Sequence, residues 1–496
     1  MMSRSFLRLC LLLCSPSCLL LRQPVLAQTS HVAVNWNQVT GVSKTTPTLQ
    51  VVVNPMLERG SPIHDGSFSA LKELGADAVR FVPWFPYPKM AVAELKPPTS
   101  TETFWDFSYI DPIMEDFMKA TEGHSVIINF STIPDWMFRT DKPVQYPEDH
   151  DQVFWNYNAG TELRDSTLKE LADYYVRLFS WYTKGGFTDE LGKFHRSGHH
   201  YKISYWEVLN EPDFEHATLP QTYTRIYDAV VTALKKVSPE TKFVALGLGS
   251  ENNPAYFEYF LNPANHQPGV PLEGISYHFY GTPSGANQTI DNWQYAFFDE
   301  ADGFIGKVRY IESIRKRLAP QTFTTIDEIG NIIGDQTGKS IPDGYWNLSG
   351  AMYAYVYVEL ARLGIDFAGE SQLVGYPTQY PDVSMMDWKN GNPNARLRVL
   401  ALLKDHFGAG DKLVASSVNT SDVTVQAFLT SKGKKLLLIN KRNKTIPLEL
   451  PAEATGAEVQ YVNASTGENP ASSSSLTDHH FTLDPFTVAV INFKDQ

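Results

Sequence analysis

The chain has 496 residues, of which 43% are hydrophobic and 20% are charged, a balance typical of folded globular proteins rather than disordered chains. Its 42 Lys and Arg residues against 55 Asp and Glu residues give a formal net charge of −13. That charge disfavours a nucleic-acid-binding function, which needs a basic face for the phosphates. The only cysteines are Cys10, Cys14 and Cys18, so we expect no disulfide and no thiolate metal site after residue 18.

The N-terminus has the pattern of a secretory signal peptide. Arg4 and Arg8 precede an apolar run over residues 9–21, and small residues ending at Ala27 suit a signal peptidase. The run is too short and too interrupted for a membrane-spanning helix. We therefore predict that residues 1–27 are a signal peptide and that the mature chain is secreted or periplasmic, with no further membrane attachment.

Between about residues 48 and 408, short apolar segments alternate with longer amphipathic ones. The short segments are almost continuously apolar, as expected of strands buried on both faces of a parallel sheet. The eight expected strands are 49–54, 76–82, 125–130, 203–209, 242–248, 274–279, 322–327 and 365–371.

Helices are expected in the segments between these strands, where apolar residues recur at three-to-four spacing. The expected helices are 111–120, 168–183, 221–237, 308–318, 348–363 and 394–406. Eight strands alternating with helices predict an α/β fold, a (β/α)8 TIM barrel over residues 48–409. The alternative is an open doubly wound sheet, which is disfavoured because no Gly-rich dinucleotide turn follows the first strand.

The sequence texture changes after Gly410. Short, often alternating apolar segments separated by turn residues predict an accessory antiparallel β-sandwich over residues 410–496. Within it, the Ser472–Ser475 run is expected to be a loop. Residues 28–47 have no helical period and are a candidate additional strand of the sandwich. We expect this domain to pack against the barrel rather than to bind sugar.

Two glutamates end otherwise apolar barrel strands. In TIM barrels the functional residues gather at the C-terminal ends of the strands, and Glu211 ends strand four while Glu328 ends strand seven. These strands face one another, so both carboxylates can point into one cleft, the arrangement used for glycoside hydrolysis. The alternative is a simple Glu-Pro turn and a solvated strand end. It is disfavoured because Arg80, Asn210 and the 278–280 segment also lie at strand ends.

At this point the sequence resembles the glycoside hydrolases of clan A, and within them most of all family 39, the β-xylosidase and α-L-iduronidase family. The resemblance spans most of the barrel and is carried by residues 104–111, 205–213 and 223–239, including Asn-Glu-Pro at 210–212. It departs from the family where Leu209 replaces the usual Trp, Val82 the usual His and Asp327 the usual Thr. Strand eight also lacks the expected sugar-stacking Trp.

The resemblance implies a retaining mechanism through a covalent glycosyl-enzyme intermediate, with Glu211 as acid/base and Glu328 as nucleophile. It also implies that Asn210 bonds the sugar hydroxyl beside the anomeric carbon, and that Arg80 and Tyr280 contact Glu328. Several tryptophans near strand ends are candidate sugar platforms, with ordinary packing as the alternative. The predicted substrate-binding residues are Arg80, Trp84, Asn129, Trp136, Asn210, His278, Tyr280, Glu370 and Trp388.

No cofactor and no metal ion are expected. His195, His199 and His200 lie close together in sequence, but without a recognisable ligand spacing. The preferred function is a β-xylosidase-like exo-glycosidase acting on an oligosaccharide or polysaccharide. The nearest alternatives are a glycosidase for a galactoside, glucoside or arabinoside, and a transglycosylase. The alternative of a different class is a non-catalytic carbohydrate-binding protein.

Overall fold

The structure is a computed structural model that describes residues 29–155, 160–283, 289–333, 340–342, 344–378 and 380–494. The predicted signal peptide therefore lies outside the described residues. Within these ranges, no helix combines the length and the apolar character that a membrane span requires.

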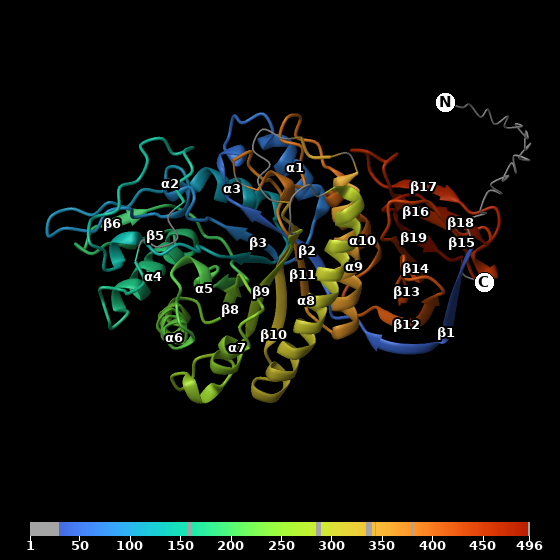
Figure 1. The fold of residues 1–496 in the computed structure, drawn as a ribbon. Coiled ribbons are helices and arrows are strands. Elements are labelled where there is room, and N and C mark those ends of the chain that lie inside the picture. The colour runs from blue at the N-terminus through green and yellow to red at the C-terminus, as the bar shows by residue number, and fades with distance from the viewer. Residues whose placement is uncertain are drawn as a thin grey trace, which may run out of the picture.

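Eight parallel strands close into a barrel, which confirms the predicted (β/α)8 fold (Figure 1). Around the barrel the strands follow the order β10-β11-β2-β3-β4-β7-β8-β9. Each predicted segment overlaps one of them. The barrel strands are β2 (Thr46–Val52), β3 (Val79–Val82), β4 (Val126–Ile128), β7 (Tyr205–Glu207), β8 (Lys242–Leu248), β9 (Gly274–Gly281), β10 (Phe323–Asn331) and β11 (Phe367–Glu370).

The helices surround this barrel, and α3 has the predicted bounds. Helix α8 begins at Ile290, well before the expected Val308, because the buried side chains of Trp293, Phe297 and Phe304 extend its apolar face. The helices are α1 (His64–Leu74), α2 (Pro88–Ala91), α3 (Asp111–Ala120), α4 (Lys169–Thr183), α5 (Pro212–Glu215), α6 (Pro220–Val237), α7 (Pro254–Phe260), α8 (Ile290–Leu318), α9 (Tyr345–Leu363) and α10 (Ala395–His406). A small hairpin of β5 (Gly186–Thr188) and β6 (Phe194–Arg196) lies between α4 and β7.

A second, curled sheet contains nine strands in the order β17-β16-β19-β14-β13-β12-β1-β15-β18. Strand β1 precedes the barrel in sequence, yet it pairs antiparallel with β12 and, at Ser30 and His31, parallel with β15. In Figure 1 this blue strand lies beside the red C-terminal strands. The strands are β1 (Ser30–Val42), β12 (Lys412–Val418), β13 (Val423–Thr430), β14 (Gly433–Asn440), β15 (Ile446–Glu449), β16 (Glu458–Val462), β17 (Ser472–Ser475), β18 (His480–Leu483) and β19 (Val488–Asn492).

The prediction of a loop at Ser472–Ser475 is wrong. These serines form β17, which pairs antiparallel with β16 at the edge of the sheet. Their side chains are mostly exposed, so neither face of the strand requires apolar residues. An all-polar edge strand of this kind leaves no alternation in the sequence from which it could be predicted.

The second sheet packs against one side of the barrel. Helices α9 and α10 lie between the two parts (Figure 1). The sheet residues Phe428, Leu437 and Val490 belong to the same continuous apolar core as the barrel helices. Arg362 of α9 also donates a hydrogen bond to Gln426 of β13 over 2.9 Å. The sheet is thus attached to the barrel by both apolar burial and polar contacts.

Candidate active site

A cavity of about 480 Å³ lies at the C-terminal ends of the barrel strands. This volume falls within the range of small-molecule sites, about 300 to 1,000 Å³. Residues from β9, β10 and the loops after β3, β7 and β8 contribute to its wall. Its lining includes Trp84, Asn210, Glu211, Phe214, Tyr280 and Glu328.

The backbone around Glu211 adopts an unusual conformation. Leu209 has φ 64° and Glu211 has φ 43°, in the left-handed region that non-glycine residues rarely occupy. Two hydrogen bonds hold this segment: the Glu211 N–H donates to Gly247 O over 2.7 Å, and Asn129 Nδ2 donates to Leu209 O over 3.0 Å. Pro212 then begins α5, a position that suits its fixed φ. The turn aims the Glu211 side chain into the cavity, and backbone strain of this kind is concentrated at functional sites.

Glu328 lies in β10 where that strand shifts register against both of its neighbours. One carboxylate oxygen accepts a hydrogen bond from Arg80 Nη1 at 2.6 Å, and the other accepts one from the Tyr280 hydroxyl at 2.7 Å. Burial alone would raise the pKa of Glu328. The charges of His278 and Arg80 and the hydrogen bonds from Tyr280 and Arg80 outweigh burial, so its pKa is lowered. Glu328 is therefore a carboxylate at neutral pH.

His278 lies beneath both glutamates and is fully buried. Its Nδ1 is 3.1 Å from Glu211 Oε1 and 3.5 Å from Glu328 Oε2. Burial alone would lower the pKa of His278, but the neighbouring Glu328, Glu211 and Asp327 raise it to about 9. One oxygen of Glu211, one oxygen of Glu328 and a ring nitrogen of His278 all lie within 4.8 Å of one another. The two carboxylates thus lie close together in the cavity wall.

Arg80 organises the layer behind the cavity. Its guanidinium is 1% exposed and donates to Glu207 at 2.5 Å, to Gln50 at 2.8 Å and to Asn210 Oδ1 at 2.7 Å. Because Asn210 Oδ1 accepts from Arg80, its amide NH₂ group is left to donate elsewhere. The guanidinium presents five donors in a rigid plane and so fixes the positions of these acceptors, whereas a lysine ammonium has three donors that rotate freely.

Asp327 and Glu207 complete this buried layer. Burial raises the pKa of Asp327 well above its usual range, and the nearby charge of Glu207 raises it further. Asp327 Oδ2 lies 3.3 Å from Arg80 Nε, and its Oδ1 lies 3.6 Å from His278 Nε2, so the two cations that contact Glu328 also face this carboxyl group.

The structure places the predicted site residues in three groups. Glu211, Glu328, Trp84, Asn210 and Tyr280 line the cavity. Arg80 and His278 lie behind it and contact Glu328, while Asn129 lies deeper and donates to Glu207 over 2.7 Å. Trp136, Glu370 and Trp388 do not line it.

The side chains of this last group have other partners. Trp136 Nε1 donates to Glu94 O over 2.8 Å, and Trp388 packs against the apolar core. Glu370 is fully buried and accepts a hydrogen bond from Arg396 Nε at 2.9 Å. A sequence position near a strand end therefore does not determine whether a side chain faces the cavity.

Several residues at the site were not predicted from the sequence. Gln50 and Glu207 are polar residues inside buried strands, and that contrast is a signal that could have identified them. Phe214 and Glu215 follow the Asn-Glu-Pro segment. Phe214 lines the cavity, and buried Glu215 accepts a hydrogen bond from Trp84 Nε1 at 2.7 Å. No sequence pattern distinguishes these two from ordinary helix residues.

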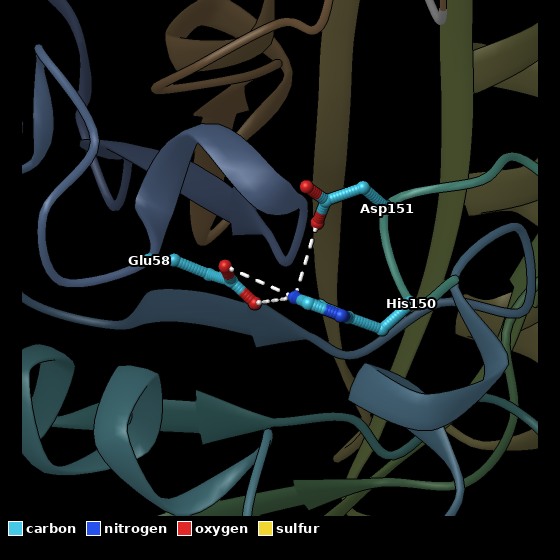
Figure 2. Close-up of side chains that lie close together, drawn as sticks. All are labelled: Glu58, His150 and Asp151. Carbon is cyan, nitrogen blue, oxygen red and sulfur yellow. Dashed lines mark hydrogen bonds and ion pairs between the residues drawn. The ribbon is translucent and has the colours of Figure 1, made fainter. Parts of the chain in front are cut away.

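Among the described residues, two groups have the spacing of metal ligands: Glu211, His278 and Glu328 at the cavity, and Glu58, His150 and Asp151 outside its lining. Figure 2 shows the second group, in which His150 Nε2 lies 3.0 Å from Glu58 and 3.2 Å from Asp151. His150 thus lies between the two carboxylates and contacts both of them.

The histidines that are close together in sequence have separate partners in the structure. His195 Nε2 lies 2.8 Å from Asp189, and His199 Nε2 lies 3.5 Å from Asp111. Each of these two histidines thus contacts a different carboxylate.

No protein-family model matches the sequence, and a comparison with curated proteins gives no match either. Solved structures do share the fold. The GH51 arabinofuranosidase from Xanthomonas axonopodis pv. citri is 12% identical, with a TM-score of 0.64 over 94% of this chain and 100% of that chain. The glucosidase from Croceicoccus marinus is 13% identical, with a TM-score of 0.61 over 94% and 99%. The GH30 endoxylanase from Clostridium papyrosolvens C71 is 14% identical, with a TM-score of 0.54 over 94% and 100%. At these identities, the chain is similar to all three in its fold.

Proposed function

We propose that this protein is a retaining glycoside hydrolase. The observation that carries the proposal is the pair of carboxylates, Glu211 and Glu328, whose oxygens approach within 4.8 Å at the wall of a 480 Å³ cavity. Retaining glycosidases hold their two carboxyl groups about 5 to 5.5 Å apart, whereas inverting enzymes need more than about 6.5 Å to admit a water molecule. The arrangement favours retention.

The two glutamates have different environments that suit different roles. Glu328 is held as an anion by Arg80, His278 and Tyr280, so it is the nucleophile that forms a bond to the anomeric carbon. Glu211 gives its proton to the oxygen of the departing group as the glycosidic bond breaks. In the second step Glu211 takes a proton from water, the water oxygen bonds to the anomeric carbon, and Glu328 leaves as a carboxylate.

The substrate is a carbohydrate, and a β-linked pentoside such as a xyloside, cleaved from a chain end, is the preferred candidate. The fold shared with an arabinofuranosidase, an endoxylanase and a glucosidase supports a carbohydrate and leaves galactosides, glucosides and arabinosides as alternatives. Membership of family 39 stays a prediction. Export of the enzyme is part of the proposal and is supported only by the sequence pattern of residues 1–27.

A mechanism-based label tests the proposal directly. Activated 2-deoxy-2-fluoro glycosides of xylose, arabinose, glucose and galactose are incubated with the protein, and intact mass is measured. We expect one sugar to add a single glycosyl group, located on Glu328 by peptide mapping, and the E328Q variant to remain unlabelled. A label on another residue would contradict the assignment of Glu328. Sugar binding without a label or turnover would instead indicate a carbohydrate-binding protein. Product analysis at high acceptor concentration then separates hydrolysis from transglycosylation.

A further inference from the structure

Phe214 is an aromatic side chain that remains half-exposed inside the cavity. It belongs to α5, directly after the Glu211-Pro212 turn, and 50% of its surface is accessible to solvent. Leaving a large apolar ring in contact with water costs free energy that burial would recover. A ring kept exposed in a cavity beside a carboxyl group is therefore a candidate ligand surface.

The position of this ring depends on the glycine opposite it. A Cβ atom on Gly249 would lie 2.4 Å from two ring carbons of Phe214 and 3.0 Å from Glu211 Oε1, so only glycine allows the ring to lie there. The N–H groups of Gly249 and Ser250 donate to the Asp213 carboxylate over 3.0 and 3.3 Å, which ties the loop after β8 to α5. The ring and the Glu211 carboxylate therefore adjoin one small region of the wall.

A second aromatic side chain in the lining is also held in place. Trp84 Nε1 donates to Glu215, the residue after Phe214, and Glu215 is itself buried. The Trp84 ring lies nearly parallel to that of Tyr380, at an interplanar angle of 24° and a centroid distance of 6.5 Å. Both rings contribute to the cavity wall, so the aromatic surface of this cavity extends beyond Phe214.

The charge of the cavity wall further restricts which ligands can bind there. The lining residues that the structure describes include the acidic Glu211, Asp213 and Glu328, but no lysine or arginine. An anionic group placed here would meet this acidic lining, while the nearby cations, Arg80 and His278, lie buried behind Glu328 and are already paired with it. Flat aromatic surfaces instead favour uncharged partners that present an apolar face.

We propose that Phe214 forms the wall of the leaving-group site and that this site selects uncharged leaving groups with a flat apolar face. The inference rests on the proposed function, because it uses Glu211 as the proton donor. The leaving-group oxygen must lie against Glu211 to receive its proton, so the group it carries extends along the surface that Phe214 adjoins. An aryl alcohol and a neutral sugar ring share this chemistry.

The test compares substrates that differ only in the leaving group. For the sugar identified by labelling, the 4-nitrophenyl glycoside, the disaccharide and the glycosyl fluoride are assayed with wild type, F214A and F214Y. Fluoride is too small to contact Phe214. We expect F214A to lower kcat/KM about 10-fold or more for the nitrophenyl glycoside, in line with losing burial against a Phe side chain, and to change fluoride hydrolysis less than about twofold. F214Y keeps the ring and should restore the aryl activity.

A matched control uses Phe194 of β6, which is 55% exposed and lies outside the cavity lining. F194A should leave all three substrates unaffected, and thermal melts of each variant confirm folding. If F214A lowers kcat/KM for both the disaccharide and the aryl glycoside, the site accepts sugar and aryl leaving groups alike. If F214A lowers kcat/KM for only one of these substrates, the site is specific for that kind of leaving group. Equal losses for fluoride and aryl substrates, or no loss for either, overturn the leaving-group site while leaving the hydrolase intact. Wild type that cleaves none of the three overturns the proposed function itself.

Discussion

Glu328 and Glu370 occupy neighbouring barrel strands, β10 and β11, and both are buried glutamates paired with an arginine. Arg80 binds Glu328 at 2.6 Å, and Arg396 binds Glu370 at 2.9 Å. Glu328 nevertheless lines the cavity, whereas Glu370 is fully enclosed. Arg396, from α10, also donates to the carbonyls of Val383 and Ser371, so it closes the structure over the strand end. The same kind of Arg–Glu pair thus lies at the cavity wall in one place and inside the packed structure in the other.

The two carboxyl groups also differ in electrostatics. Burial raises the pKa of Glu370 to about 7 because the single charge of Arg396 does not offset it fully. Glu328 experiences similar burial, but two cations and a tyrosine hydroxyl lower its pKa. The number of partners, rather than the presence of one arginine, determines which glutamate stays ionised.

The largest contrast is expected in activity. E328Q removes the proposed nucleophile and should reduce turnover of the best glycoside about 10,000-fold or more. E370Q changes a group outside the cavity and should retain turnover within about fivefold, a margin for small shifts of the packing around it. Steady-state rates of the two variants measure this difference. A comparable loss in both would mean that Glu370 also acts in the reaction.

For stability, the larger effect is expected at the Arg396–Glu370 pair. R396M leaves Glu370 buried without a cation and should lower the free energy of unfolding by about 3 to 5 kcal/mol, measured by urea denaturation. The double variant R396M/E370M removes the unpaired carboxyl as well and should recover part of that loss. If R396M unfolds at the same urea concentration as wild type, the pair is not structural.

The Tyr280 hydroxyl should contribute a smaller effect. Y280F removes one charge-assisted hydrogen bond to Glu328, which is worth about 1.5 to 3 kcal/mol, so kcat should fall about 10- to 100-fold. Tyr353 provides the matched control, since its buried hydroxyl donates to Ala368 O over 2.8 Å, next to Glu370. Y353F should leave kcat unchanged, and an equal decrease would point to a general loss of packing.

The pH dependence of stability should be the smallest effect. The pKa of His278 is raised from 6.5 to about 9 in the folded protein, so its stabilising contribution is complete below about pH 6.5. That contribution is lost as the pH rises through 9. Melting temperatures of wild type should therefore decline between pH 6.5 and 9 more steeply than those of H278Q. Parallel curves for the two proteins would show that His278 does not titrate in this range.

The sequence predicted the barrel well because its strands are buried on both faces and therefore continuously apolar. It also predicted that Glu211 and Glu328 face one cleft, because their charge contrasts with the apolar strands that lead to them, and both line the cavity. It also predicted that Glu370 binds substrate at the cavity, because the sequence does not show that Arg396 from α10 encloses Glu370, whereas Glu328 lies at the register shift of β10. Trp136 has the same difficulty, since its hydrogen bond to Glu94 O is a long-range contact.

Strand β1 has a consequence for how the polypeptide can be divided. It lies between β12 and β15, so the C-terminal segment alone lacks the strand that joins the two parts of its sheet. A fragment starting near residue 410 would expose two unpaired strand edges, which invite aggregation. During folding, the first strand after residue 29 must await partners that are synthesised last, and such distant pairings form slowly. The second sheet is therefore completed only once the whole chain is available, because its first and last strands in sequence belong to the same sheet.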